Sequence, residues 1–206
     1  MNIIKKLPEN LINQIAAGEV IERPSSALKE LLENSIDAGS TEIEIFITDG
    51  GKSLIEVVDN GRGMTANDLK MCLQRHATSK ITDGDLVNIN SLGFRGEALP
   101  SIGSIAEISI DSHDMSENES WNISVINNTL QGIVPSTIRE GTKVTIRDLF
   151  SKVPARLKFL KTNGTEVRYC REIVKHLAMS HPNIAFSFSI DAKRNFYWNK
   201  SKEINF

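Results

Sequence analysis

Cysteine is scarce in this chain, with two residues in 206, and aromatic residues make up only 6% of it. Cys72 and Cys170 stand alone in helix-like stretches that lack the spacing of metal ligands. This pattern favours buried apolar roles over a disulfide or catalysis. The four histidines are scattered along the chain, so a zinc site has little support.

Long apolar runs are also missing, and no stretch stays apolar for long enough to cross a membrane. The beginning, MNIIKKLPENL, is too short and too polar for a signal peptide. We therefore expect a cytoplasmic protein with no membrane contact. With 206 residues and 40% hydrophobic content the chain can bury a substantial core, which favours one domain over residues 1–206.

Two common phosphate-binding sequences do not occur in the chain. There is no G-x-x-x-x-G-K-[ST] sequence, and no G-x-G-x-x-G follows a predicted strand. A P-loop and a Rossmann site are therefore not expected. Any nucleotide site has to be built from other segments.

The segment 23–39, RPSSALKELLENSIDAG, predicts a well-delimited helix. Pro24 suits the first helical position, and Gly39 follows the end, where a left-handed cap is common. At about 100° per residue, the leucines of the segment gather on one side of this helix. That side is expected to pack against the core.

The opposite side of the same helix carries Glu30, Asn34 and Asp37 within an arc of about 60°. Two carboxylates and an amide on one short wall suit a magnesium-bound phosphate ester. A charged helix face is also commonly no more than a solvated surface. The helix alone leaves both interpretations open.

A hairpin is predicted after this helix. Isoleucines alternate with other residues over 43–47, DGG at 49–51 predicts a turn, and LIEVVD at 54–59 returns as a second strand. The hairpin delivers the sequence DNGRG at the end of a strand. The chemistry of that sequence decides what the hairpin is for.

Asp59 opens the DNGRG sequence, and Gly61 and Gly63 remove side chains that would keep a flat ligand from the backbone. An ionised carboxylate only accepts hydrogen bonds, so Asp59 suits a ligand with an exocyclic amine, as in adenine. Asp-Asn-Gly is also ordinary turn chemistry. The sequence gains weight because it follows the polar helix and one hairpin.

A third segment, SLGFRGEALPSIGSI at 91–105, places Gly93 and Gly96 around Arg95, directly before a predicted helix. Backbone amides at a helix start form an anion site, and Arg95 could add charge or pair with a nearby acid. The preceding polar stretch, residues 75–90, is either a flap over a ligand or an ordinary surface loop.

The remaining pattern predicts an α+β fold with a largely antiparallel, mixed sheet that helices cover on one face. One further amphipathic helix is expected at 165–180, between strands. The expected strands of this part are 106–112, 120–128, 142–150, 185–191 and 195–200.

Charge is distributed unevenly along the chain. Residues 1–142 hold 11 Lys/Arg and 21 Asp/Glu, whereas residues 143–206 hold 13 and 5. The basic part could contact a DNA backbone without reading its sequence, with Arg156, Lys158 and Lys161 as candidates. It could equally be a solvated surface.

Four sequence boxes resemble the GHKL ATPase superfamily in the order that the superfamily has them: EN…DA, DNGRGM, GFRGEAL and the Gly141-Thr142 pair. NQIAAGEVIERP, RHATSK and GFRGEALPSI are similar to the amino-terminal domain of the MutL family of DNA mismatch repair proteins. VPARLKFLK, from Val153, extends the likeness over essentially the whole chain.

The resemblance implies a two-layer Bergerat sandwich that binds ATP and Mg²⁺. Glu30 would be the general base that activates water, Asn34 would ligate the metal, and Asp59 would recognise the adenine amine. Asp37 would order neighbouring backbone, with direct contact to the ligand as the alternative. The positions implied to bind the cofactor are Asn34, Asp59, Gly61, Gly63, Met64, Thr78, Ser79, Lys80, Gly93, Phe94, Arg95, Gly96, Glu97, Ala98, Leu99 and Thr142.

The resemblance also implies moving parts and partners. Residues 1–20 would form an arm and 74–98 an ATP lid, which nucleotide orders, so that a homodimer forms; IAAG at 15–18 could instead be a packed turn of the domain. The expected partners are mismatch-recognition proteins, downstream repair proteins, and double- or single-stranded DNA. Family members continue into a transducer-type domain that supplies a lysine to the terminal phosphate; this chain stops at Phe206, so weak ATP hydrolysis is expected.

Two other functions fit part of the pattern. A nucleotide-binding module that does not hydrolyse its ligand would use the same pocket only as an interaction platform, and Glu30→Ala would leave its properties unchanged. A kinase of the histidine-kinase type would need a phosphoacceptor histidine domain, for which the sequence offers no candidate.

Overall fold

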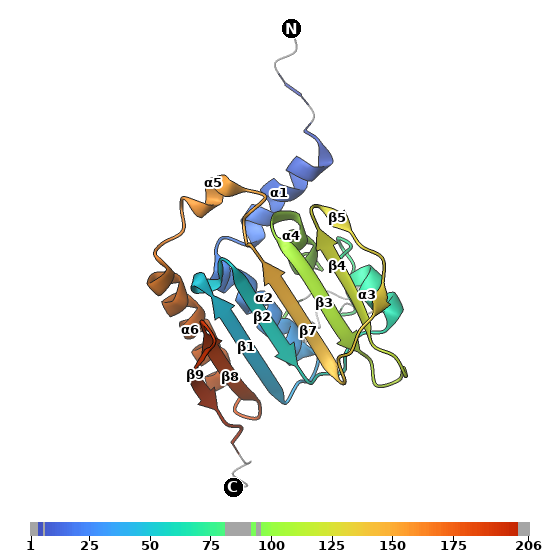
Figure 1. Cartoon of the computed structure of the whole chain (residues 1–206), viewed down its shortest axis with the longest axis vertical. Coiled ribbons are helices and arrows are strands. Elements are labelled where there is room, and N and C mark those ends of the chain that lie inside the picture. Colours follow the sequence, from blue (N-terminus) through green and yellow to red (C-terminus); the bar gives the residue numbers. More distant parts are fainter. Residues whose placement is uncertain (1–3, 6, 81–91, 94–95, 202–206) are drawn as a thin grey trace.

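One mixed sheet holds every strand of the described chain (Figure 1). This computed structural model describes residues 4–5, 7–80, 92–93 and 96–201. The sheet order is β5-β4-β3-β7-β2-β1-β8-β9, with β6 paired to β4. The strands are β1 (Glu42–Thr48), β2 (Leu54–Asp59), β3 (Glu107–His113), β4 (Trp121–Ile126), β5 (Thr129–Leu130), β6 (Val134–Pro135), β7 (Gly141–Arg147), β8 (Ala185–Ile190) and β9 (Lys193–Trp198).

The described helices lie mainly on one face of this sheet, behind it in Figure 1. The long ones are α2 and α6, and α1 packs beside α4. The helices are α1 (Glu9–Val20), α2 (Pro24–Asp37), the short 3-10 helix η1 (Asp49–Gly51), α3 (Ala66–Cys72), α4 (Ala98–Ile105), α5 (Pro154–Leu157) and α6 (Asn163–Ser180).

Strand pairing brings two distant parts of the sequence together at one end of the sheet. β2 runs antiparallel to both β1 and β7, and its register sets Asp59 opposite Ile43 on one side and Thr142 on the other. β1 pairs in parallel with β8, which the chain reaches through α6. All other strand pairs within the described ranges are antiparallel, as the sequence predicts for a largely antiparallel mixed sheet.

The core lies between the sheet and the helices. Alternate residues of β1, Ile43, Ile45 and Ile47, are at most 1% exposed and belong to the same buried cluster as Leu28 and Leu31 of α2. Burial of such side chains removes apolar surface from water and stabilises the two layers against each other. The predicted α+β class, with helices covering one face of the sheet, is confirmed.

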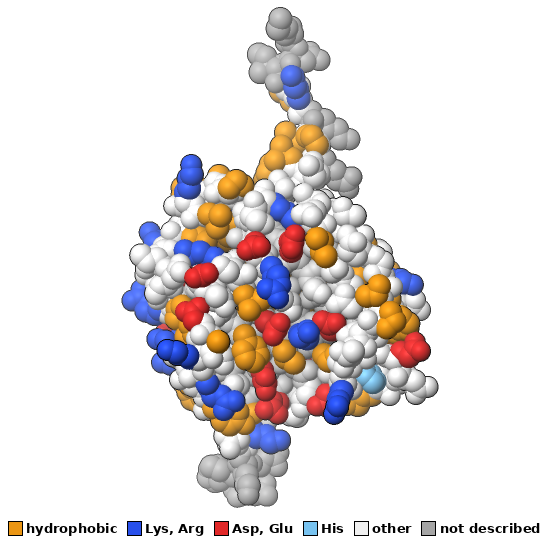
Figure 2. Space-filling model, in the orientation of Figure 1, with side chains coloured by type: hydrophobic (Ala, Val, Ile, Leu, Met, Phe, Trp, Pro, Cys, Tyr) orange, Lys and Arg blue, Asp and Glu red, His pale blue; other side chains and the backbone are white. Residues whose placement is uncertain are grey.

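The other face of the sheet presents a mixture of charged, polar and apolar side chains to the viewer in Figure 2. Two cross-strand contacts tie it together. Lys143 Nζ on β7 lies 3.4 Å from a carboxylate oxygen of Asp111 on β3, and Thr145 Oγ1 donates to Glu56 of β2 at 3.0 Å. This alternation of apolar and polar faces is typical of an antiparallel sheet that is covered on one side.

The predicted helix over 23–39 is present with the expected ends. α2 begins at Pro24 and ends at Asp37, and Gly39 has a φ of +77°. For the preceding segment, the alternative of a packed turn at 15–18 is confirmed in its packing on the domain and wrong in its conformation. IAAG lies inside α1, and Ala17 is fully buried in the core.

The two cysteines are both free thiols. Cys170 is buried, and Cys72 is half-buried. Burial raises the pKa of each thiol to about 12, so both are protonated and poorly nucleophilic at neutral pH. Among the described helices, none is both long and apolar enough to cross a membrane.

Candidate nucleotide site

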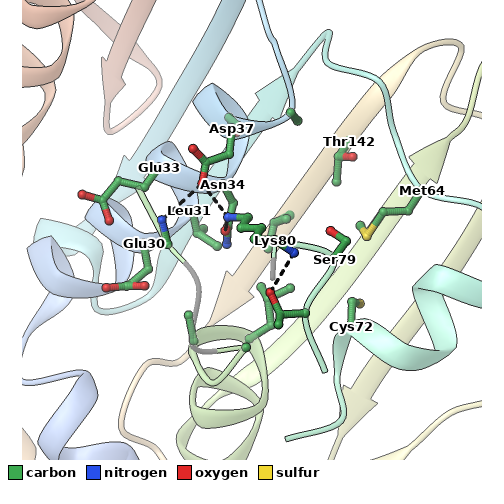
Figure 3. A pocket seen from close by; sticks show the side chains of 18 of the residues that line it. Glu30, Leu31, Glu33, Asn34, Asp37, Met64, Cys72, Ser79, Lys80 and Thr142 are labelled. Carbon is green, nitrogen blue, oxygen red and sulfur yellow. Dashed lines mark hydrogen bonds and ion pairs between the residues drawn. The ribbon is translucent and has the colours of Figure 1, made fainter. Parts of the chain in front are cut away.

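A cavity of about 1000 Å³ opens between α2, α3 and α4 and reaches the ends of β2 and β7. Figure 3 shows Glu30, Asn34 and Asp37 on one wall, and Met64, Cys72 and Thr142 on another. The predicted site residues that line it are Glu30, Asn34, Asp59, Gly63, Met64, Thr78, Ser79, Lys80, Gly93, Gly96, Glu97, Ala98, Leu99 and Thr142.

Asp59 lies at the inner end of this cavity and is only 7% exposed. Ser35 Oγ of α2 donates to its Oδ2 at 2.7 Å, and the Gly61 amide donates to its Oδ1 at 2.9 Å. Burial raises the pKa of this carboxyl group above its ordinary value, while the Ser35 and Gly61 hydrogen bonds oppose the rise. The carboxylate is thus fixed in place, as recognition of a donor group requires.

Gly61 and Gly63, the two glycines after Asp59, have different structural roles. Gly63 has a φ of +73°, and a Cβ at this position would lie 1.9 Å from the carbonyl oxygen of His113. Gly61 does not line the cavity directly; its role is to hold the carboxylate, and a Cβ there would lie 2.8 Å from the Cβ of Ala38. Both positions therefore require the absence of a side chain.

Thr142 stands beside Asp59 because of the strand register. Its hydroxyl is 2.8 Å from Ser112 Oγ of β3, which also accepts a hydrogen bond from the Met64 amide at 2.9 Å. Ser112 is fully buried. It therefore links two cavity-lining residues, Met64 and Thr142, through a single hydroxyl.

The α2 wall carries the other predicted polar groups, and Asp37 makes several contacts there. Its Oδ1 accepts the Leu92 amide at 3.0 Å, and its Oδ2 accepts the Gly93 amide at 3.2 Å. Lys80 Nζ donates to Asp37 Oδ2 at 2.6 Å and to Asn34 Oδ1 at 2.8 Å. Asp37 thus holds neighbouring backbone, in the way the sequence interpretation favours.

Gly96 and the start of α4 form the remaining wall. Gly96 has a φ of +63°, and a Cβ there would lie 2.4 Å from the carbonyl oxygen of Ala77. Ala98 is the first residue of α4, and both Ala98 and Leu99 line the cavity. The predicted contacts of Phe94 and Arg95 lie outside the described residues.

The oxygen atoms of the α2 wall suit a magnesium ion that is also coordinated by water or phosphate oxygens. Mg²⁺ commonly takes one or two protein oxygens and completes its shell with water and phosphate oxygens. Asn34 offers a neutral oxygen to the cavity, and that oxygen already contacts a cation, the Lys80 ammonium. In the part of the chain that the structure describes, no cluster of three or more His, Cys, Asp or Glu side chains could hold a metal ion. The donor set therefore fits a metal that is bound together with a nucleotide.

The three candidate DNA contacts differ in their surroundings. Arg156 of α5 is half-buried and packs against α1, since a Cβ on Gly18 would lie 2.1 Å from its Nη2. Lys158 and Lys161 are exposed, with Phe159 between them 79% exposed. The two lysines are thus accessible to a partner, whereas the arginine is partly covered by α1.

Two serines that support the site are missing from the residues that the sequence predicts. Ser35 bonds Asp59, and Ser112 bonds Thr142 and Met64. Ser35 gives a signal, because it falls seven residues after Leu28 on the apolar side of the helix, where a hydroxyl needs a partner. Ser112 gives no such signal, since its role depends on the pairing of β3 with β7.

Comparison with known proteins explains this geometry. Residues 21–148 match the family described as histidine kinase-, DNA gyrase B- and HSP90-like ATPases. The chain belongs to this GHKL ATPase family. The match covers every described part of the cavity except the end of α1.

Curated relatives agree with the resemblance to MutL. A DNA mismatch repair protein MutL from Bradyrhizobium sp. (strain ORS 278) is 51% identical over 195 residues, which are 95% of this chain and 32% of the relative. MutL from Rhodopseudomonas palustris (strain TIE-1) is 50% identical over 95% of this chain and 33% of the relative. The chain thus spans about a third of the length of the curated relatives that it matches.

A solved structure extends the likeness to the fold. The Aquifex aeolicus MutL ATPase domain complexed with ADP superimposes with a TM-score of 0.74 at 33% identity, over 89% of this chain and 66% of that one. The predicted two-layer Bergerat sandwich of this GHKL chain is confirmed by the match. The predicted resemblance to the MutL amino-terminal ATPase domain is confirmed as well.

Proposed function

We propose that this chain binds ATP with Mg²⁺ in the described cavity and hydrolyses it, as the nucleotide-responsive domain of a DNA mismatch repair protein. The observation that carries the proposal is that one cavity joins Asp59 and Thr142 at one end to Glu30 and Asn34 at the other. A volume of about 1000 Å³ is ample for a nucleotide. The similarity to a MutL ATPase domain that was solved with ADP supports the same ligand class.

In this proposal each end of the cavity has its own task. Asp59 accepts a hydrogen bond from the adenine amine, and Gly63 and Met64 border the base. Asn34 supplies an oxygen to the metal, which neutralises phosphate charge when it is bound. Glu30, one turn before Asn34 on α2, orients and deprotonates the attacking water.

Phosphates would lie between the α2 wall and the start of α4. Thr78, Ser79 and the 93–99 stretch border that space, where they are described. The backbone amides at the start of α4 and the positive end of its dipole favour negative charge there. Closing a nucleotide into this space would order the proposed lid, residues 74–98, at the cost of its conformational entropy.

Weak hydrolysis by the 206-residue chain is part of the proposal. Among the described lysines, Lys29 and Lys80 line the cavity. Lys29 pairs with Glu33 at 3.2 Å, and Lys80 pairs with Asp37. Both cations are thus engaged with acids of α2, and slow hydrolysis is the expected consequence.

The proposed switch ends in dimerisation through the arm, residues 1–20. Supporting it, α1 presents Leu11, Ile12 and Ile15 at 40%, 43% and 51% exposure. Exposed apolar side chains on one helix favour contact with another protein surface. The proposed partners are a second copy of the chain, mismatch-recognition proteins and downstream repair proteins, in the cytoplasm, where DNA of the bacterial relatives lies.

DNA contact is proposed for the basic part of the chain, on double or single strands. Lys158 and Lys161 are the best-placed candidates because they are exposed, whereas Arg156 is packed on α1. Such contacts neutralise backbone phosphates, so the affinity should fall steeply with salt. Replacing both lysines with glutamine should flatten the slope; a slope unchanged by these replacements would remove them from the interface.

The central test is a titration with a non-hydrolysable ATP analogue, followed by calorimetry and by sedimentation. We expect one magnesium-dependent site per chain and a shift toward dimer as it fills. A steady-state assay on the same protein should show slow ATP hydrolysis. Absence of binding would refute the proposal, and binding without any sedimentation shift would remove only its dimerisation step.

A further inference from the structure

Lys80 places its ammonium group between two side chains of the α2 wall. Its Nζ lies 2.8 Å from Asn34 Oδ1 and 2.6 Å from Asp37 Oδ2, and Figure 3 shows it directed at both. The side chains of Lys80 and Asp37 are only 18% and 9% exposed. The contact is therefore partly shielded from water, where charge–charge attraction is stronger than on an open surface.

Asp37 keeps the lysine at this place and closes the wall around it. The same carboxylate accepts the amides of Leu92 and Gly93 at 3.0 and 3.2 Å. A Cβ on Gly93 would lie 3.4 Å from Lys80 Nζ and 3.9 Å from Asn34 Oδ1. The backbone at Gly93 thus lies close to both the lysine ammonium and the Asn34 oxygen.

In this arrangement Lys80 competes with a divalent cation for the Asn34 side-chain oxygen. Asn34 Oδ1 is the oxygen that the proposed function assigns to the metal, and the Lys80 ammonium already donates a hydrogen bond to it at 2.8 Å. A second positive ion at the same oxygen would meet repulsion at close range. The lysine contact and metal binding at Asn34 therefore exclude each other.

We propose that Lys80 is a resident cation that neutralises the Asn34–Asp37 wall in the nucleotide-free protein and must leave Asn34 before a divalent cation can use that oxygen. Asp37 is the positioning residue that holds the lysine there. The inference rests on the proposed function, because it assumes that Asn34 is the metal-facing residue. It adds that free metal should be excluded from Asn34 in the absence of nucleotide and accepted there together with nucleotide.

The test measures whether a metal ion can approach the Asn34 side chain, and it does not depend on hydrolysis. The Asn34 side-chain amide is followed by NMR while Mn²⁺, whose paramagnetism broadens nearby signals, is added to the nucleotide-free protein. In the wild type the Asn34 signal should stay sharp and should be lost only when ADP is added as well. In Lys80→Met it should be lost with Mn²⁺ alone.

Three variants make the result specific. Lys80→Arg keeps the cation and should behave like the wild type. Lys29→Met removes a cavity-lining lysine that pairs with Glu33, and it should also leave the Asn34 signal sharp. Asp37→Asn should make the Asn34 signal sensitive to Mn²⁺ alone, and it should add no further Mn²⁺ broadening in the Lys80→Met background, because Asp37 controls metal access through the lysine.

Two results would overturn the inference. One is loss of the Asn34 signal with Mn²⁺ alone in the wild type, and the other is a sharp signal in folded Lys80→Met under the same conditions. Calorimetry with ADP and Mg²⁺ on the wild type separates this failure from failure of the proposed function. If ADP binds but Lys80→Met gives no change, only the role of Lys80 is lost.

Discussion

The two ends of the cavity are built in different ways. At the Asp59 end, the described contacts join side chains and backbone of α2, β2, β3 and β7, and the key carboxylate is 7% exposed. At the Asn34 end, the polar groups are satisfied by Lys80 and by the backbone at 92–93. One end is preorganised by the sheet, whereas the other relies on contacts that a ligand can replace.

This contrast suggests that the two ends of the cavity contribute differently to binding and to hydrolysis. A preformed base pocket spends little free energy on ordering when it binds its ligand. A phosphate end that exchanges its own contacts for ligand contacts can change conformation with the state of the nucleotide. Affinity should therefore depend mostly on the first end, and hydrolysis and signalling on the second.

The largest effect should come from Glu30→Ala, at the replaceable end. We expect kcat to fall by about 100- to 10,000-fold, the usual contribution of a general base, while ADP affinity stays near that of the wild type. Steady-state hydrolysis and calorimetry measure the two quantities. Glu33→Ala, on the same helix and lining the same cavity, is the matched control and should hydrolyse normally. Unchanged hydrolysis in Glu30→Ala would favour a binding module.

Asp59→Asn should mainly affect binding, because it changes the preorganised end. Loss of a hydrogen bond to a charged group costs about 1.5 to 3 kcal/mol, so ADP affinity should drop by roughly 10- to 100-fold. Calorimetry measures the affinity, and circular dichroism shows whether the fold is retained. A folded variant with unaltered ADP affinity would mean that Asp59 does not contact the base.

Gly63→Ala tests whether the base pocket depends on close backbone approach. The new Cβ would lie 1.9 Å from the His113 carbonyl oxygen, at a φ of +73°. We expect a loss of about 1 to 3 kcal/mol in the free energy of unfolding, seen in denaturant titration. Gly132→Ala, where a Cβ would meet nothing within 4 Å, is the control. Equal stability of the two variants would contradict a tight approach of Gly63 to the end of β3.

The smallest effect concerns pH. Burial raises the pKa of Asp59, so its contribution to folding is complete below the unfolded value of 3.8 and is lost as the pH rises through the raised folded value. Binding has the opposite sign, since the ionised group accepts a hydrogen bond from the adenine amine more strongly than the protonated group does. ADP affinity should fall by about half where the pH equals the folded pKa. Asp59→Asn should show no such step in calorimetry across acidic pH.

Much of this structure could be predicted from the sequence. The ends of α2, the hairpin of β1 and β2, and the start of α4 follow from local signals such as Pro24, Gly39 and the DGG turn. Those signals act within a few residues of the chain, so periodicity and turn chemistry capture them. Asp59 and Asn34 lie 25 residues apart, so their place in one site followed from the order of the sequence boxes and the family resemblance rather than from local signals.

What could not be predicted depends on contacts between distant segments. Ser112 supports Thr142 only because β3 pairs with β7, and Arg156 is half-buried because it packs on Gly18. A place for Lys80 near phosphates stays a prediction, and its contact with Asn34 and Asp37 crosses more than 40 residues of sequence. Counting charges cannot tell a packed side chain from an exposed one.

The parallel pairing of β1 with β8 determines where the chain can be truncated without disrupting the fold. Phe186 and Phe188 of β8 are fully buried, although they lie beyond residue 148, where the family match stops. A shorter piece that ended there would lack β8. It would leave β1 as an unpaired edge strand and expose the core residues that now pack against Phe186 and Phe188. Such an edge invites aggregation through strand addition. Any minimal expression fragment of this ATPase should therefore retain α6 and β8.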